Sequence, residues 1–472
     1  MQALIGARRW VWRVLGFSVI GLTLWGCGGG GTSAPVSVIQ ENPPISTPPA
    51  IDPTQPGNPP PPITEPPVSP PVHPPKPLVG SLGVTIGYSV LPSAQWDKIA
   101  SAGFDLVRFD MVWATVERSP GVYDFRSSGQ DYDAMISACQ SRGIRVMFIL
   151  DYGNPLYDGG YAPFTPAGRA AFAQFASVAA RHYANRDVIW EIWNEPNEPN
   201  FWRRSPATTQ SAASDYAELC RVVIPAIRNA DPSATIIGPS VNGFDPSTSI
   251  EFVRQLGSRG LLPKLDAVSI HPYRTSAPES AELDYATLRS VLASYGVANM
   301  TILNSEVGRH TGSVAPGVEI DEPAQASLLV RTALTDITSG VPLTTLYTWS
   351  NASDNPGDAL GNFGIVRSDG LTEKPSYNAV QTMRGLLRGA SFVERPNLSL
   401  GEGVRAIRFD TNLGSVLVLW ATDGLPHSAV LPPTSGTWRI VSTLGVTLSE
   451  GNSTNAPSAT VTSDPLYLVL SK

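Results

Sequence analysis

The chain has 472 residues, of which 42% are apolar, and this is enough for a large domain with one core plus a smaller domain. Acidic residues outnumber basic ones, 40 to 33, so the net charge at pH 7 is −7. Because there is no basic excess, the composition argues against nucleic acid as a partner and against anionic membrane surfaces.

The first 27 residues are typical of an export signal. Arginines precede an apolar run, 14–25, which is short for a membrane span and lies where a signal peptide has its apolar core. The run ends in Leu24-Trp25-Gly26-Cys27, which resembles the bacterial lipobox and implies that Cys27 becomes lipidated. Plain cleavage and a retained membrane anchor are the alternatives, and Arg8-Arg9 also resembles a twin-arginine signal. We expect an exported protein, lipid-anchored at the bacterial cell surface or outer membrane, or otherwise periplasmic or secreted.

Residues 28–78 form a tract of glycine and proline. Four glycines follow Cys27, and 18 of the 44 prolines in the chain lie between Pro35 and Pro77. The tract has no apolar periodicity and cannot bury a core, so we expect a disordered or polyproline-like spacer. At roughly 3.1 Å per residue, such a spacer reaches on the order of 100 Å, enough to hold a domain away from a membrane.

From residue 79 to 388 short apolar strands alternate with amphipathic helices. Strands are predicted over 82–86, 106–109, 146–150, 188–193, 234–237, 267–270, 301–304 and 344–349. Helices are predicted over 92–102, 132–142, 166–184, 212–229, 249–256, 283–295, 323–339 and 375–387. Eight such units predict an α/β fold, a (β/α)8 TIM barrel. A doubly wound open sheet is the alternative, but the glycine-rich phosphate turn that it often carries is missing after the first predicted strand.

Residues 389–472 contain short apolar segments separated by turns, at 403–409, 415–421, 438–445 and 466–471. They predict a small antiparallel β-domain, similar to a sandwich, that covers a flank of the barrel. Trp420 and Trp438 could form a carbohydrate-binding surface there, but core aromatics are the simpler interpretation. Cys139 and Cys220 lie within predicted helices and are expected to be buried thiols.

Two carboxylates stand at predicted strand ends, Glu195 after the fourth strand and Glu306 after the seventh. In a closed barrel the loops after the strands meet at one mouth, so both side chains can converge on one bond. Glycoside hydrolysis needs such a pair, one group to protonate the leaving oxygen and one to attack or stabilise the sugar. Glu191 is the rival of Glu195, but it has the same strand parity and lies roughly 13 Å deeper, which predicts a buried pairing role inside the barrel.

The order of these motifs resembles the clan A glycoside hydrolases, most closely family 39 and the related family 5. The resemblance rests on four segments: Asn194-Glu195-Pro196, His271-Pro272-Tyr273, Glu306 within LNSEVG, and YTW at 347–349. The stretch that follows the second predicted strand, VRFDMVWATVERSPGVYDF, and the stretch before the last helix, GIVRSDGLTEKPSYNAV, also resemble those enzymes. The resemblance covers residues 79–387 and implies a retaining β-glycosidase.

The resemblance also implies a role for particular residues. Glu195 would be the general acid/base and Glu306 the nucleophile, with the two carboxyl groups about 5 to 5.5 Å apart. Asn194 would bind the 2-hydroxyl of the sugar in the −1 subsite, and Trp349 would form the floor of that subsite. Tyr273 and Arg108 would orient or stabilise Glu306.

Other residues near predicted strand ends could bind further hydroxyls or stack on sugar rings. They are Trp113, Asp151, Tyr152, Asn154, Trp193, Trp202 and Tyr347. His271 could contact a hydroxyl or be held in the barrel wall. Neither the cysteines nor the five histidines have metal-ligand spacing, and no cofactor motif is present, so we expect no metal and no cofactor.

Two hypotheses follow for function. The first is a monomeric, exported, retaining β-glycoside hydrolase that acts on a polysaccharide or oligosaccharide. The second is a surface carbohydrate-binding protein built on a hydrolase-like barrel without activity. The presence of both carboxylates favours the enzyme. The sequence leaves glucan, xylan, mannan and a bacterial exopolysaccharide open as substrates, because specificity depends on loop shape.

Overall fold

The computed structural model describes residues 80–126, 129–315, 318–396, 398, 400, 402–431 and 436–471. All of them belong to one compact unit. The expected signal segment, the lipidation site Cys27 and the proline-rich tract lie outside the described residues.

The centre of the structure is a closed barrel of parallel strands, in the order β1-β12-β9-β8-β7-β6-β5-β2. The strands are β1 (Ser81–Thr85), β2 (Leu106–Val112), β5 (Arg145–Asp151), β6 (Ile189–Ile192), β7 (Thr235–Asn242), β8 (Ala267–His271), β9 (Thr301–Val307) and β12 (Leu343–Leu346). Each predicted strand overlaps one of them. The TIM barrel is confirmed, and closure of the sheet excludes the doubly wound alternative.

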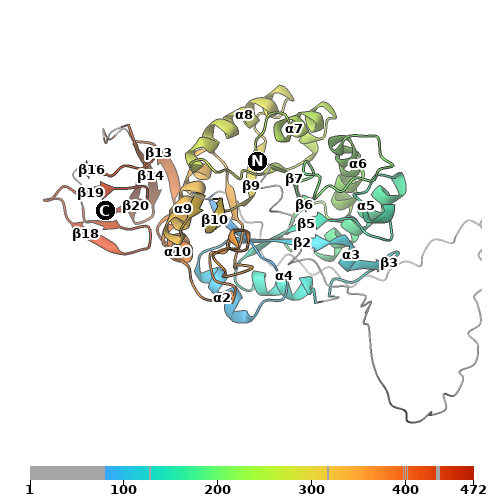
Figure 1. Ribbon diagram of the computed structural model, residues 1–472, viewed down its shortest axis with the longest axis horizontal. Coiled ribbons are helices and arrows are strands. Elements are labelled where there is room, and N and C mark those ends of the chain that lie inside the picture. The colour runs from blue at the N-terminus through green and yellow to red at the C-terminus, as the bar shows by residue number, and fades with distance from the viewer. Residues whose placement is uncertain are drawn as a thin grey trace, which may run out of the picture. The chain divides into compact units, whose positions relative to one another are not determined.

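A helix follows each barrel strand, and Figure 1 shows the helices around the strands. They are α2 (Ser93–Ser101), α4 (Tyr132–Gln140), α5 (Pro166–His182), α6 (Ala212–Ala230), α7 (Ser249–Ser258), α8 (Ala281–Ser294), α9 (Glu322–Thr338) and α10 (Pro375–Leu387). Several start at a side-chain cap. Asp131 accepts from the backbone N–H of Ala134 in α4, and Thr165 accepts from that of Gly168 in α5. Within the described part of the chain, none of the helices has the length and apolarity to cross a membrane.

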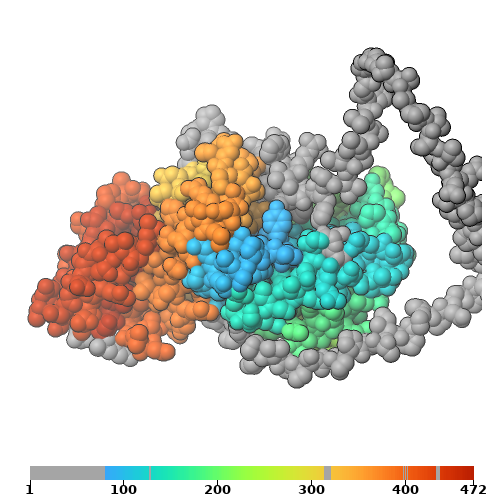
Figure 2. Space-filling model, turned by 90° about the horizontal axis from the view of Figure 1, so that it is seen from below, coloured from blue at the N-terminus to red at the C-terminus, as the bar shows by residue number. Residues whose placement is uncertain are grey.

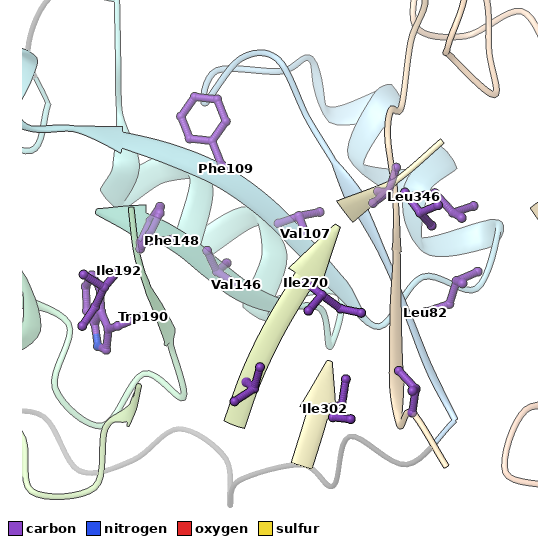
Figure 3. Packing of buried hydrophobic residues seen from close by; sticks show 14 of the residues in the cluster. Leu82, Val107, Phe109, Val146, Phe148, Trp190, Ile192, Ile270, Ile302 and Leu346 are labelled. Atoms are coloured by element: carbon purple, nitrogen blue, oxygen red, sulfur yellow. The ribbon is translucent and has the colours of Figure 1, made fainter. Parts of the chain in front are cut away.

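The two faces of each strand pack differently. Outward-facing side chains such as Val107, Phe109, Val146 and Phe148 pack in the layer between barrel and helices (Figure 3). Inward-facing side chains fill the lower part of the barrel. This plug consists of Leu106, Met147, Ile189, Ile237, Ala267, Leu303 and Leu343. Most of the inward residues that follow along the strands are polar. They are Arg108, Glu191, Ser269, Ser305 and Thr345, so an apolar base lies below a polar mouth at the carboxyl ends.

The loops at the mouth carry short elements of their own. They are α3 (Trp113–Val116), β3 (Glu117–Ser119), β4 (Val122–Tyr123), η1 (Asp158–Gly160), η3 (Pro278–Ser280), β10 (Gly312–Ala315), β11 (Val318–Ile320) and η4 (Ala359–Gly361). A further turn, η2 (Leu262–Lys264), precedes β8. The β10–β11 hairpin and η4 belong to the loops that follow β9 and β12.

The C-terminal residues form the antiparallel sheet that the sequence predicts. Its order is β13-β14-β15-β20-β17-β18, and β16 pairs with β19 beside it. The strands are β13 (Ser391–Glu394), β14 (Val404–Thr411), β15 (Gly414–Ala421), β16 (His427–Val430), β17 (Trp438–Val441), β18 (Thr447–Gly451), β19 (Ser458–Val461) and β20 (Leu466–Ser471). Its core continues into that of the barrel.

The contact between sheet and barrel is anchored by Trp420, whose indole Nε1 donates to Oε1 of Glu279 at 2.7 Å. Arg331 of α9 donates through Nε and Nη2 to the two oxygens of Glu279, each at 2.8 Å. The space-filling view shows the C-terminal residues in red beside the orange residues that include α9 and α10 (Figure 2). Trp420 and Trp438 are both buried, so they are core aromatics and not an exposed sugar platform. Cys139 and Cys220 are buried free thiols.

Candidate active site

Glu195 and Glu306 meet at the mouth of the barrel, as the sequence predicts. Glu195 follows β6, and Glu306 is the next-to-last residue of β9. One carboxylate oxygen of each lies within 4.8 Å of the other. Glu195 is 1% exposed and Glu306 is 9% exposed, so both carboxylates are buried.

A bulge in β9 turns Glu306 toward the mouth. Asn304 faces outward, because its amide donates to Asp336 of α9 at 2.7 Å. In a regular strand Glu306 would share that face. However, β12 pairs Thr344 with Asn304 and Leu346 with Val307, so β9 holds one extra residue between these pairs. Such a bulge re-aims a side chain, and here it brings Glu306 inside.

The backbone also leaves the strand geometry before Glu195. The predicted strand 188–193 ends at Ile192, and Trp193 and Glu195 have positive φ angles of 65° and 44°. Non-glycine residues seldom adopt this conformation, and residues held in it cluster at functional sites. The prediction that Glu191 and Glu195 point to the same side of one strand is therefore wrong, since it assumes an extended backbone up to Glu195. The buried pairing role predicted for Glu191 is confirmed, because Glu191 is fully buried and forms an ion pair with Arg108.

Arg108 of β2 holds the site together with one guanidinium. It donates through Nε to Oε2 of Glu191 at 2.7 Å and through Nη1 to Oε2 of Glu306 at 2.5 Å. Nη2 lies 2.9 Å from Oδ1 of Asn194 and 3.2 Å from Nε2 of His271. Burial acts to lower the pKa of Arg108, but the charges of Glu191 and Glu306 outweigh it and raise the pKa.

Tyr273 completes the support of Glu306. Its hydroxyl donates to Oε1 of Glu306 at 2.8 Å, while Arg108 binds Oε2. Each oxygen of this carboxylate thus has a donor that fixes its orientation. The contacts of Tyr273 and Arg108 with Glu306 are those that the family resemblance implied.

His271 has a tautomer that its neighbours define. Arg108 can only donate, so Nε2 of His271 accepts and carries no proton. Nδ1 therefore carries the hydrogen and donates to Oε1 of Glu195 at 2.9 Å. His271 is fully buried in β8, which favours the barrel-wall interpretation over contact with a sugar hydroxyl.

Asn194 is oriented by the same network. Its Oδ1 accepts a hydrogen bond from Arg108. The amide nitrogen, Nδ2, is therefore the atom that can contact a ligand. An amide N–H group can donate to a sugar hydroxyl.

Two predicted sugar contacts, Trp113 and Asn154, have other partners. Trp113 is buried, donates to Oε2 of Glu117 at 2.6 Å and stacks on Tyr157. Asn154 donates to the carbonyl of Glu117 at 2.8 Å, and its own oxygen accepts from a backbone N–H. Both build the loops around the site.

Trp349 is also not the floor of the site. It is 1% exposed, and its ring packs edge-on against Phe104 and Tyr377 in the layer between barrel and helices. The family resemblance implied a place in the sugar site, but Trp349 lies past the end of β12 and its ring turns away from the mouth. Trp193 and Trp202 are likewise buried and pack on each other.

The partly exposed aromatic rings near Glu306 are Tyr273, Tyr347 and Phe363. Phe363 makes edge contacts with Tyr273 at 6.4 Å and with Tyr347 at 5.4 Å between ring centres. The sequence analysis missed Phe363, which lies in the long loop after β12. The glycines beside Phe363 were the signal that could have drawn attention to this loop. At Gly364 the chain packs so closely that a Cβ would meet the backbone N of Asn351 at 2.1 Å, so only glycine fits there.

Asp110 and Asp151 form an acidic pair next to this network. Asp151 was predicted as a sugar contact but is fully buried, whereas Asp110 of β2 is partly exposed. Burial raises the pKa of Asp110 to about 6 and raises the pKa of Asp151 well above its ordinary value. The sequence places Asp110 among the polar groups at the end of the second predicted strand, but it assigns this residue no role.

Glu195, His271 and Glu306 also form the kind of group that could hold a metal ion, with ligand atoms within 4.8 Å of one another. Their own contacts oppose this use. Both oxygens of Glu306 accept from Arg108 and Tyr273, and both ring nitrogens of His271 are engaged. A cation beside Arg108 would also meet its positive charge.

Structures with the same fold are found among glycoside hydrolases. A family 39 glycoside hydrolase from the gut symbiont Bacteroides cellulosilyticus aligns with a TM-score of 0.70 at 23% identity, over 83% of this chain and 81% of that one. A family 39 beta-xylosidase from Caulobacter crescentus aligns at 0.59 and 18% identity, over 84% and 96%. A family 30 endoxylanase from Clostridium papyrosolvens aligns at 0.58 and 11% identity, over 84% and 97%. At these identities the likeness shows the shared fold.

Two comparisons of the amino-acid sequence, with a single relative and with a family model, show the family to which the chain belongs. A beta-xylosidase from Geobacillus stearothermophilus is 29% identical over 100 residues, which cover 21% of this chain and only 18% of that relative. The family described as cellulase, glycosyl hydrolase family 5, matches residues 91–339, more than half of the 472. The chain therefore belongs to glycosyl hydrolase family 5 and has the barrel of the clan A glycoside hydrolases.

Proposed function

We propose that the protein is a retaining glycoside hydrolase that cleaves β-O-glycosidic bonds. The observation that carries this is the approach of Glu195 and Glu306, where one carboxylate oxygen of each lies within 4.8 Å of the other. In inverting enzymes the two carboxyl groups are roughly 6.5 to 9.5 Å apart, because a water molecule must fit between the general base and the anomeric carbon. Direct attack by a carboxylate suits the shorter spacing.

In the first step Glu306 attacks the anomeric carbon and forms a covalent glycosyl-enzyme, while the bond to the leaving oxygen breaks. Arg108 and Tyr273 aim the carboxylate, one donor on each oxygen. Glu195 transfers its proton to the leaving oxygen, so that an alcohol departs. Because His271 donates to Oε1 of Glu195, the proton that is transferred belongs on Oε2.

In the second step Glu195, now a carboxylate, accepts a proton from water as that water attacks the anomeric carbon. The bond to Glu306 breaks, and the sugar leaves with its original configuration after two inversions. The amide nitrogen of Asn194 donates to the 2-hydroxyl, whose hydrogen bond strengthens in the oxocarbenium-like transition state. Tyr347 and Phe363 provide apolar ring surface at the edge of the same site.

The substrate is a polysaccharide or oligosaccharide, and the protein acts as a monomer. The matched relative is a beta-xylosidase and the family carries the name of the cellulases, so β-xylosides and β-glucosides are the first substrates to test. The screen uses aryl β-glycosides and polysaccharides with wild type, Glu195→Gln and Glu306→Gln. Hydrolysis by wild type alone supports the enzyme. Sugar binding without any turnover would support the inactive carbohydrate-binding protein instead.

We also propose export with a lipid on Cys27, on the strength of the sequence alone. Expression in a bacterium that is fed labelled palmitate tests it. Label in wild type and its loss in Cys27→Ser is the expected result. An unlabelled wild-type protein in the medium would point to plain cleavage.

A further inference from the structure

The acidic pair of Asp110 and Asp151 lies at the mouth of the barrel, where β2 and β5 end. These strands are neighbours, and Asp151 is in register with Val112, two residues after Asp110. Asp110 shares the inward face of β2 with Arg108, because side chains two residues apart point the same way. A side-chain contact between the two carboxyl groups shifts the pKa of each, lowering that of Asp110 and raising that of Asp151. A contact between two carboxyl oxygens needs a proton, so the pair holds one between them.

Burial maintains this state. It is the main cause of the raised pKa of Asp110; the charge of Arg108 opposes it, and the charges of Glu306 and Glu191 add to it. The hydrogen bonds of the Arg108 guanidinium go to Glu191, Glu306, Asn194 and His271. No N–H or O–H group among the described residues donates to either oxygen of Asp151. A carboxyl group in such a place is stable only when it is protonated. Asp151 therefore carries the shared proton and donates it to Asp110.

We propose that Asp110 and Asp151 act as one unit in which Asp110 binds a hydroxyl of the sugar next to Glu306, and that the pair selects the sugar. This inference rests on the proposed hydrolase function and names a specificity-determining residue for it. Asp110 is the contact because it is partly exposed, and Asp151 is a positioning residue because it is fully buried. Asn194 faces the 2-hydroxyl in the proposed mechanism, so Asp110 takes the 3- or 4-hydroxyl.

The state of Asp110 sets the strength of this contact. When one proton is shared, Asp110 is a carboxylate and accepts a charge-assisted hydrogen bond from the sugar. Below its pKa of about 6 it becomes neutral, and the hydrogen bond weakens. The titratable groups that act on Asp110 are Arg108, Tyr132, Asp151, Tyr152, Glu191 and Glu306. KM is therefore expected to rise as the pH falls through about 6.

The test pairs enzyme variants with deoxy substrates. Wild type, Asp110→Asn and Asp110→Ala are assayed on an aryl β-glycoside that wild type hydrolyses and on its 3-deoxy and 4-deoxy analogues. Asp336→Asn is the matched control, since Asp336 is a buried aspartate that binds Tyr285, Asn304 and Thr344 away from the mouth. Asp151→Asn tests positioning, with kcat and KM measured separately over pH.

We expect wild type to lose at least about tenfold in kcat/KM on one of the deoxy analogues, the cost of one hydrogen bond to a charged group. Both Asp110 variants should discriminate against that analogue much less, whereas Asp336→Asn should discriminate as wild type does. Asp151→Asn should raise KM more than it lowers kcat. It should also shift the pH at which KM begins to rise on the acid side. The rise of KM at low pH should disappear on the sensitive deoxy analogue, a result that needs no variant.

Equal discrimination by wild type and the Asp110 variants would overturn the inference, even if the variants were slower on every substrate. So would a wild-type KM with the same pH dependence on the parent glycoside and on both deoxy analogues. A wild-type protein that hydrolyses no glycoside would instead overturn the proposed function, and the inference with it.

Discussion

Arg108 and Glu306 meet across the mouth of the barrel, with Nη1 of the arginine 2.5 Å from Oε2 of the glutamate. The same guanidinium binds Glu191 through Nε at 2.7 Å, and Arg108 is only 1% exposed. The position of the proposed nucleophile thus depends on an ion network that the barrel keeps out of water. Such a network is costly to break, because the remaining charges stay buried.

Replacement of Arg108 by lysine keeps the charge but removes the planar fork. One ammonium cannot reproduce three directed contacts to Glu191, Glu306 and Asn194. We expect kcat/KM to fall by at least about 100-fold and the free energy of unfolding to fall by up to about 3–5 kcal/mol. Urea denaturation and steady-state kinetics measure both. Arg331→Lys, which keeps the charge but loses the two parallel hydrogen bonds to Glu279, should lower stability and leave kcat unchanged.

Replacement of Glu195 by glutamine should affect substrates according to their leaving group. A general acid contributes about 10²- to 10⁴-fold, but a dinitrophenolate leaves without a proton. On an alkyl glycoside the variant should lose that full factor. On a dinitrophenyl glycoside it should form the glycosyl-enzyme quickly and then stall, which gives a burst of phenolate. Equal losses on both substrates would argue against Glu195 as the acid.

Tyr273→Phe removes one donor from Glu306 and leaves the ring in place. A hydrogen bond to a charged group is worth about 1.5–3 kcal/mol, so kcat should fall by about 10- to 100-fold. Tyr285→Phe is the control, because the Tyr285 hydroxyl donates to the buried carboxylate of Asp336 outside the mouth. That variant should unfold at a lower temperature and keep its kcat. Similar losses of activity in both variants would mean that Tyr273 acts only through the fold.

Asp336 makes a separate prediction for the pH dependence of stability. Burial raises its pKa to about 6, despite hydrogen bonds from Tyr285, Asn304 and Thr344. A carboxyl whose pKa is higher in the folded state binds a proton more tightly there, so its contribution is complete below about pH 4 and is lost as the pH rises through about 6. Relative to Asp336→Asn, the wild-type free energy of unfolding should fall by up to about 3 kcal/mol from pH 4 to pH 7. A difference between the two proteins that stays constant or grows over this range would contradict the assignment.

Most of the barrel could be predicted from the sequence because its signals are local and repeated. Each strand is a short apolar segment followed by an amphipathic helix, and caps such as Asp131 and Thr165 lie where the helices begin. The pairing of Glu195 with Glu306 also follows, because a closed barrel gathers its strand ends at one mouth.

The direction of individual side chains could not be predicted in the same way. Strand alternation places Glu306 on the outer face until the bulge in β9 is known, and it says nothing of Glu195, where φ is 44°. The family resemblance implied that Trp349 is the floor of the sugar site, but Trp349 lies beyond β12 and points into the helix layer. Bulges and turns arise from packing between elements, which a single sequence does not display.

The most direct test of the central claim is the configuration of the first product. Proton NMR during hydrolysis of an aryl β-glycoside distinguishes the α- and β-anomers before they interconvert. With Glu306 as nucleophile and Glu195 as acid/base, the β-anomer should form first and the α-anomer should follow by mutarotation. If the α-anomer forms first, water attacks the sugar directly, and the double-displacement mechanism proposed for Glu195 and Glu306 is wrong.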